Sequence, residues 1–188
     1  MARLTTIVFI LSTLLSSNRK DNPPFDTIIF HTTRCFGTCP VYHLQLGSDK
    51  KVKLFAEYVF NGQIKRNRKW PTSDNDKMGY FEGYANNKSF QKLLKIISTA
   101  GLDTVKYNAE FCCDAPVITI IIYQNNKRIY IKSMFLPEKL RPLTDVLYEI
   151  CKNGKLKRTN KKFDIESEEH MNKGDLNSPI EINNQTNH

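Results

Sequence analysis

The sequence predicts an α+β fold in which an antiparallel sheet of about six strands carries two helices on one face. The first observation is the stretch RCFGTCPVY at residues 34–42, where two cysteines lie symmetrically about a glycine between two apolar runs. The second is a set of short segments in which apolar and polar residues alternate, as strands do. The third is a change to a period of 3.6 in residues 89–101 and 141–151. The elements follow one another as β-β-β-β-α-β-β-α.

The first two strands are predicted to form a hairpin whose apex is Gly37. Opposed residues in antiparallel pairing have position numbers with a constant sum, which is 74 for this apex. Phe30 then lies opposite Leu44, and Ile28 opposite Leu46, so that the large apolar side chains share one face. The other face carries the more polar set, which is Ile29, His31 and Thr33 against Val41, His43 and Gln45.

The same register places Cys35 opposite Cys39. Opposed residues have Cα atoms roughly 4.5 to 5.5 Å apart, which is within the range of a disulfide. We therefore predict a Cys35–Cys39 disulfide that closes the turn. Gly37 is expected to supply the positive φ that a three-residue loop commonly needs.

Two other roles for these cysteines stay open. The spacing of His31, Cys35, Cys39 and His43 resembles a two-Cys, two-His zinc set. However, each histidine is roughly 13 Å along its strand from the nearer cysteine, whereas zinc ligands converge to about 2.0–2.3 Å from one ion. Thiol oxidoreductases usually carry C-x-x-C at a helix start, and here C-x-x-x-C leads through Pro40 into a strand. The residues favour a structural disulfide and predict no catalytic residue, cofactor or metal.

The composition is that of a globular protein with one domain. The chain has 188 residues, of which 40% are hydrophobic and 11% aromatic, and its net charge is +9. The basic excess is spread along the chain and is too diffuse to indicate a nucleic-acid partner. The cysteines are odd in number, so at least one has no partner within the chain, and the pairing of three of them stays open: Cys112, Cys113 and Cys151.

The N-terminal residues 1–17 predict a secretory signal peptide, and residues 18–24 a polar leader. Arg3 precedes a short apolar run that ends in serines, and this run is shorter than the 20 or so residues that span a membrane. A buried N-terminal element is the alternative, because Leu14 or Leu15 occupies the cleavage position that usually holds a small residue. We expect an exported protein of the periplasm or cell envelope, without a transmembrane helix.

The remaining elements follow from periodicity and turn signals. Residues 52–60 alternate as a third strand, and Asn61-Gly62 is the strongest two-residue hairpin signal. It predicts a fourth strand at 63–70, whose basic residues suit a solvated edge. The other predicted elements are a helix at 89–101 capped by Ser89 and ended by Gly101, strands at 117–123 and 128–134, and a helix at 141–151.

One domain is expected over residues 25–153, followed by a disordered polar tail at 154–188. The tail lacks periodicity, is rich in Asn and Lys, and buries too little apolar area to offset its ordering entropy.

The runs CFGTCPVYHLQL and VKLFAEYVFNGQ, the amphipathic helix, and an Asp-x-Pro before an apolar strand together resemble a family of bacterial domains of unknown function, number 6438 in its series. The resemblance covers about residues 26–153. It implies a small α+β domain that commonly follows an export signal in bacteria with complex envelopes, and it implies no known activity. The motif residues, whose role is unknown, are Gly37, Pro40, Tyr42, Asp114 and Pro116.

The two motifs leave an alternative for the disulfide. Packing of the Asp114 motif against the first motif would allow Cys113 to pair with Cys35 or Cys39.

The function that the sequence favours is that of a non-catalytic binding or interaction module of the cell envelope. Its partner is unknown, and an envelope protein or a surface ligand would fit. No Ser-His-Asp order, phosphate-binding glycine loop or pair of catalytic carboxylates can be assembled from the residues. The alternatives are a thiol-redox or other enzyme that uses Cys35 and Cys39, and a metal-binding domain.

Overall fold

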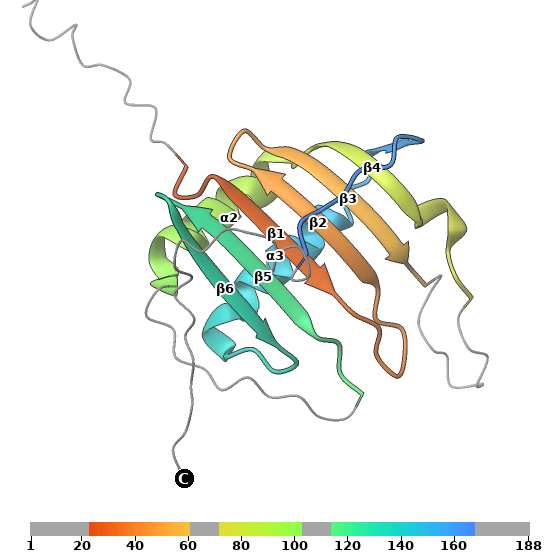
Figure 1. Ribbon diagram of the computed structural model, residues 1–188, viewed down its shortest axis with the longest axis horizontal. Helices are drawn as coiled ribbons and strands as arrows, with labels where there is room; N and C mark the ends of the chain where they lie inside the picture. The colour runs from red at the N-terminus through yellow and green to blue at the C-terminus, as the bar shows by residue number, and fades with distance from the viewer. Residues whose placement is uncertain (1–22, 61–71, 103–113, 168–188) are drawn as a thin grey trace, which may run out of the picture.

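The structure, a computed structural model, describes residues 23–60, 72–102 and 114–167. Seven strands form one antiparallel sheet in the order β6-β5-β1-β2-β3-β4-β7, and α2 and α3 cover one of its faces (Figure 1). The strands are β1 Thr27–Thr32, β2 Val41–Gly47, β3 Lys51–Tyr58, β4 Gly79–Tyr84, β5 Ile118–Gln124, β6 Lys127–Ser133 and β7 Lys157–Thr159. The helices are α2 Asn87–Ala100 and α3 Arg141–Cys151, with short 3-10 turns at Asn75–Lys77 and Glu138–Leu140. The predicted α+β class, with two helices on one face of an antiparallel sheet, is confirmed.

The first hairpin has the register that the sequence predicts. Phe30 pairs with Leu44 and Ile28 with Leu46, and all four side chains are fully buried on the helix-covered face. β1 also pairs with β5, where Phe30 lies opposite Ile120. β1 therefore lies inside the sheet, and its apolar residues form the centre of the core.

α2 begins at a residue whose side chain caps the free backbone N–H groups, and it ends at a glycine. The side chain of Asn86 accepts a hydrogen bond from Ser89 N at 2.8 Å, so Asn86 is the N-cap, and the prediction of Ser89 was wrong by three residues. Gly101 ends α2 with φ 53°, as predicted. A 2.8 Å ion pair between Lys92 and Glu149 joins α2 to α3.

The fourth strand of the sheet is β4, in a stretch that reads as turn-rich in the sequence. Its two glycines and its lack of aliphatic residues hide the strand pattern, and pairing with β3 on one side and β7 on the other holds it in the sheet. Gly79 has φ 117°, a conformation that favours glycine, and a Cβ there would lie 3.2 Å from Arg158 Nη2. The strand predicted at 63–70 lies outside the described residues.

The expectation of disorder from residue 154 onward was wrong for the first part of that segment. Residues 157–159 form β7 on the edge of β4, and residues 160–167 then run across the sheet on the face opposite the helices (Figure 1). The physical reason is that the edge of β4 offers backbone partners to a segment with no apolar pattern of its own. Residues 168–188 lie outside the described part of the chain.

The predicted signal peptide, most of the leader, and the pair Cys112 and Cys113 also lie outside the described residues. Among the helices that are described, none is long and apolar enough to cross a membrane.

Candidate functional site

The loop between β1 and β2 is closed by a disulfide. The Sγ atoms of Cys35 and Cys39 lie 1.96 Å apart, and their Cα atoms 5.6 Å apart. Phe36, at the tip, is 77% exposed. Gly37 does not adopt a positive φ, contrary to the expectation, and a Cβ there would lie at an ordinary 3.7 Å from Cys35 Sγ. The conformation of the loop therefore does not depend on the positive φ that glycine allows.

The two sequence motifs lie side by side. Phe36 N donates to the carbonyl oxygen of Asp114 at 3.1 Å, and Val117 N donates to Thr33 Oγ1 at 2.9 Å. The Asp114 motif therefore packs against the first motif, which was the condition for Cys113 to pair with Cys35 or Cys39. Cys35 is nevertheless bonded to Cys39. The Asp114 side chain is exposed and Pro116 is half-buried, so this motif contacts the first loop through its backbone.

Pro40 and Tyr42 act at the base of the same loop. The hydroxyl of buried Thr32 donates to the Pro40 carbonyl at 2.9 Å and accepts from Tyr42 N at 3.0 Å. The Tyr42 ring lies in the core, 6.2 Å from the ring of Tyr148, and burial is the main cause that raises its pKa. Both residues hold the hairpin onto the core.

The zinc hypothesis is wrong in the form that the spacing suggested. Its two cysteines are bonded to each other, and within the described ranges no group of three or more His, Cys, Asp and Glu side chains could hold a metal ion. The two histidines do meet, because His31 pairs with His43 across β1 and β2. They lie on the face of the sheet opposite the helices, which we call the helix-free face.

The contacts of the histidines fix which nitrogen donates. His31 Nε2 lies 2.6 Å from the backbone oxygen of Glu166, which only accepts, so His31 Nε2 carries the proton. In a neutral His31 ring, Nδ1 then accepts from His43 Nδ1 at 2.8 Å. His43 Nε2 lies 3.3 Å from a carboxylate oxygen of Glu57 and donates to it only when the His43 ring carries a proton on both nitrogens. Polar contacts of these side chains thus join β1, β2 and β3 to the segment that follows β7.

A row of stacked rings crosses the helix-free face. His43 stacks on Phe55 at 5.6 Å between ring centroids, and Phe55 stacks on Tyr80 at 4.5 Å. These residues come from β2, β3 and β4 at directly opposed positions, so the sheet register itself builds the row.

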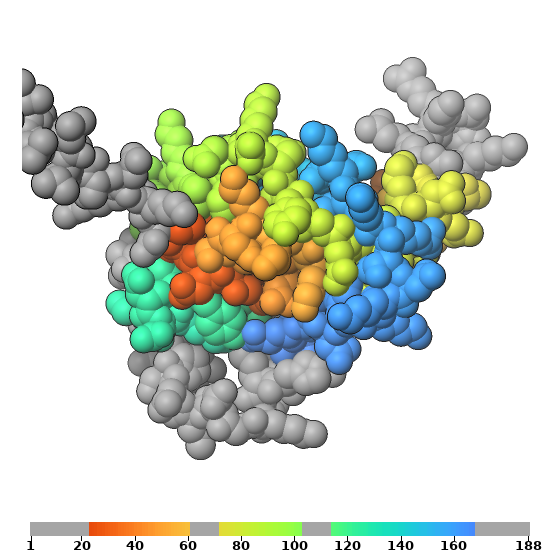
Figure 2. Space-filling model, turned by 90° about the horizontal axis from the view of Figure 1, so that it is seen from above, coloured from red at the N-terminus to blue at the C-terminus, as the bar shows by residue number. Residues whose placement is uncertain are grey.

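Residues 160–167, which we call the strap, lie on this row and extend it. The ring of Phe163 meets Tyr80 edge-on at 5.0 Å, with Lys53 Nζ 5.8 Å from its centroid. At the far end of the strap, Glu166 Oε1 accepts from the hydroxyl of Tyr123 at 2.5 Å. Burial first, and this hydrogen bond second, raise the pKa of Tyr123, while the neighbouring Arg128 side chain lowers it; the net direction is upward, so the phenol remains a donor. Figure 2 shows the strap, in the darkest blue, on the side of the molecule opposite α2.

Two apolar residues of the helix-free face are buried, and in the register they lie between His31 and Tyr123, which both contact the strap. Ile29 is 2% exposed and Ile121 is fully buried, although their positions in the register place both on the helix-free face. The central strands β1 and β5 therefore have apolar residues on both faces. A sheet with one face in water would instead carry polar residues on that face.

Arg128 of β6 marks the end of the site. Its Nε lies 3.8 Å from Glu166 Oε1, with its side chain 16% exposed. Two of its nitrogens, Nε and Nη2, are buried and have no hydrogen-bond partner in the part of the chain that the structure describes. Because buried donors without partners are costly, this guanidinium has unused capacity for an anionic oxygen.

Cys151 is the cysteine that is free and described, and it lies in the core at the end of α3. Burial raises the pKa of its thiol, which makes it a poor nucleophile. Its position agrees with the apolar stripe of the helix.

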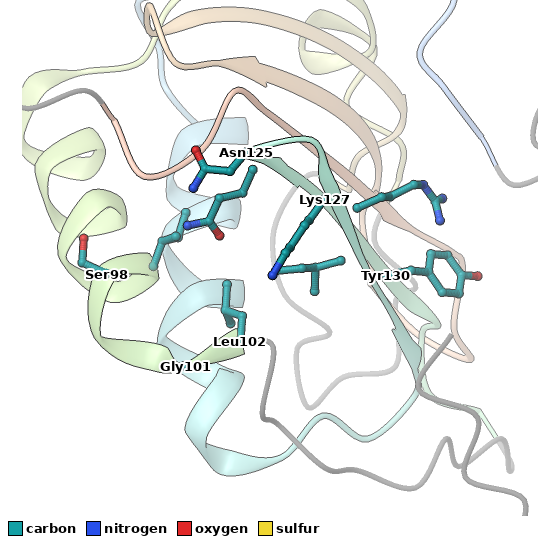
Figure 3. Close-up of a pocket in the computed structure, with 10 residues that line it drawn as sticks. Ser98, Gly101, Leu102, Asn125, Lys127 and Tyr130 are labelled. Atoms are coloured by element: carbon teal, nitrogen blue, oxygen red, sulfur yellow. The ribbon is translucent and has the colours of Figure 1, made fainter. Parts of the chain in front are cut away.

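A cavity of about 420 Å³ lies between the C-terminal end of α2 and the β5–β6 hairpin. Lys127 reaches toward it, Ser98 and Asn125 lie on its rim, and Tyr130 points away to the other side of the hairpin (Figure 3). The described lining offers two cationic residues, Lys127 and Arg128, and uncharged groups beside apolar ones, and it shows no cluster of catalytic groups.

The sequence singled out the disulfide loop and missed the strap. The alternation of β1 and β2 did place His31 and His43 on a common polar face. The partner of His31 is Glu166, which is 135 positions away, and no local pattern reports such a contact. The one available signal was Phe163 and Ile165, two apolar residues in an otherwise polar segment.

A model of the family described as "Domain of unknown function (DUF6438)" matches residues 26–151. The chain belongs to this family. The match ends at the last residue of α3, so β7 and the strap lie outside the part of the DUF6438 domain that it covers. No curated protein matches the chain.

Proposed function

We propose that this DUF6438 protein is an exported, non-catalytic binding module of the cell envelope, and that its binding surface is the helix-free face. The observation that carries the proposal is the strap itself, an extended segment that lies on this face and is held by side chains from β1, β4 and β5. A sheet face that accommodates one extended segment has the shape and the polar groups to accommodate another.

Export is supported by the disulfide and by the predicted signal peptide. Disulfides persist in oxidising compartments and are rare in the cytosol. The bonded pair lies in a loop between two strands, away from any described helix N-terminus that would lower a thiolate pKa. A structural staple therefore accounts for these cysteines better than a redox centre.

Photo-crosslinking in cells that make the protein tests this function. A photoreactive amino acid replaces Lys53, which is exposed on the helix-free face, or Lys95, which is exposed on α2 and serves as the matched control. We expect a discrete crosslinked product in the envelope fraction from position 53 and not from position 95. Equal products from both positions, or none from position 53, would refute a binding role for this face.

A further inference from the structure

We infer that the strap is an internal stand-in for the ligand, and that the helix-free face takes from another protein an extended segment bearing an aromatic side chain and, three positions later, a carboxylate. This inference rests on the proposed function and names its partner by chemistry.

The strap defines the two ends of the site. At one end Tyr80 and Lys53 contact the Phe163 ring, which is the arrangement that an aromatic side chain prefers, with an edge-on neighbour and a cation nearby. At the other end a phenol hydroxyl and a guanidinium face the Glu166 carboxylate. Between them, His31 donates to a backbone oxygen, a contact that any peptide offers whatever its side chains.

The strap is held in a way that allows exchange. Among the described residues, no backbone–backbone hydrogen bond joins 160–167 to the sheet, whereas β7 just before it pairs with β4 as a regular strand. Side-chain contacts at the periphery open at lower free energy than a ladder inside the sheet. The strap can thus leave the face while β7 stays in place.

The strap is also an imperfect ligand. Glu166 reaches Arg128 at 3.8 Å through Nε and leaves Nε and Nη2 without hydrogen bonds. A carboxylate placed slightly closer would accept from both nitrogens in the bidentate geometry that guanidinium groups favour. A segment from another chain that forms this bidentate contact with Arg128 binds the face more tightly than the strap does. It can therefore displace the strap.

Charge complementarity favours the same partner. The cationic groups of the site are Lys53 and Arg128, and the whole chain has a net charge of +9. An acidic segment is therefore attracted before it makes contact.

Binding of a fluorescent peptide that copies residues 160–167 tests the inference by polarisation. The protein is the full chain, either unchanged or with the double substitution Phe163→Ala and Glu166→Ala, which weakens the strap. Because a tethered segment competes at a high effective concentration, we expect the variant to bind the peptide at least tenfold more tightly than the unchanged chain. A peptide with alanine at the positions of Phe163 and Glu166 should not bind either protein.

Two further variants locate the site. In the strap-weakened background, Arg128→Gln should reduce peptide affinity at least tenfold, and Lys95→Gln on α2 should leave it unchanged. Should the double variant fail to fold, the single substitution Glu166→Gln serves in its place, with the same direction of effect.

Equal binding by the strap-weakened and unchanged chains, or an affinity that does not depend on Arg128, would overturn the inference. So would a concentration-dependent dimer of the unchanged chain, because the occupant would then be the strap of a second copy. A crosslink from position 53 combined with no peptide binding would reject this partner chemistry and leave the binding module intact. Peptide binding without a crosslink would support the partner chemistry and reject a binding role for this face in cells.

Discussion

Removal of the disulfide gives the sharpest test of how the first hairpin is held. The double substitution Cys35→Ser and Cys39→Ser opens a ring in which the bonded residues are four positions apart. In the chain-entropy treatment, a ring of about five residues contributes roughly 2 kcal/mol, because closing a short loop constrains the unfolded chain only modestly. We expect the free energy of unfolding to fall by about 2 kcal/mol, with the fold retained, since the core does not include these sulfurs.

Urea denaturation measures this loss, with an expected shift of about 1 M in the midpoint if the slope is near 2 kcal/mol per M. The unchanged protein in excess reductant is the matched control, and it should show the same shift, while reductant should not affect the double variant. A loss well above 4 kcal/mol would refute the reasoning, because the loop would then organise the core. A loss near zero would show that the hydrogen bonds around Thr32 and Pro40 suffice.

Four further predictions follow from single residues. Gly37→Ala should change the free energy of unfolding by less than about 0.5 kcal/mol in urea denaturation, because Gly37 has no positive φ and has room for a Cβ; a loss above 1 kcal/mol would contradict this. Phe30→Ala should cost about 3–5 kcal/mol in the same assay, since the ring is fully buried and meets Tyr148 edge-on at 5.2 Å. Burial raises the pKa of Cys151, so the folded chain keeps a proton that the unfolded chain loses; stability should fall above about pH 8.5, by up to about 1.4 kcal/mol per pH unit, and Cys151→Ala should reduce that slope. Nitrogen NMR should find neutral His31 protonated at Nε2, and protonation at Nδ1 would refute the contact with the Glu166 carbonyl.

The parts of the fold that the sequence predicted are those whose pattern is local. The hairpin register follows from alternation about one apex, and Phe30 and Leu44 meet as expected. α3 spans Arg141–Cys151, the same residues that its apolar period indicates. α2 begins two residues before the predicted start, because Asn86 rather than Ser89 caps it, and the two residue types are equally good caps.

The parts that the sequence did not predict depend on partners far along the chain. β4 contains Gly79 and Gly83, which are poor strand residues, and it is a strand because β3 and β7 pair with it. β7 has three residues, and none of them is apolar. The strap has a place only because strands from both halves of the chain build the surface beneath it, so its site could not be found from any single segment.

The burial of Ile29 and Ile121 links this fold to the proposed function. Both residues lie on the helix-free face, and a sheet that displays them to water would present an apolar patch of the kind that attracts other chains. The fold therefore favours an occupant on this face, and the strap contacts His31 and Tyr123 on either side of the two isoleucines. The strap is held by side chains and leaves Arg128 incompletely paired, so another segment can replace it. The same surface therefore both needs a cover and allows that cover to be exchanged.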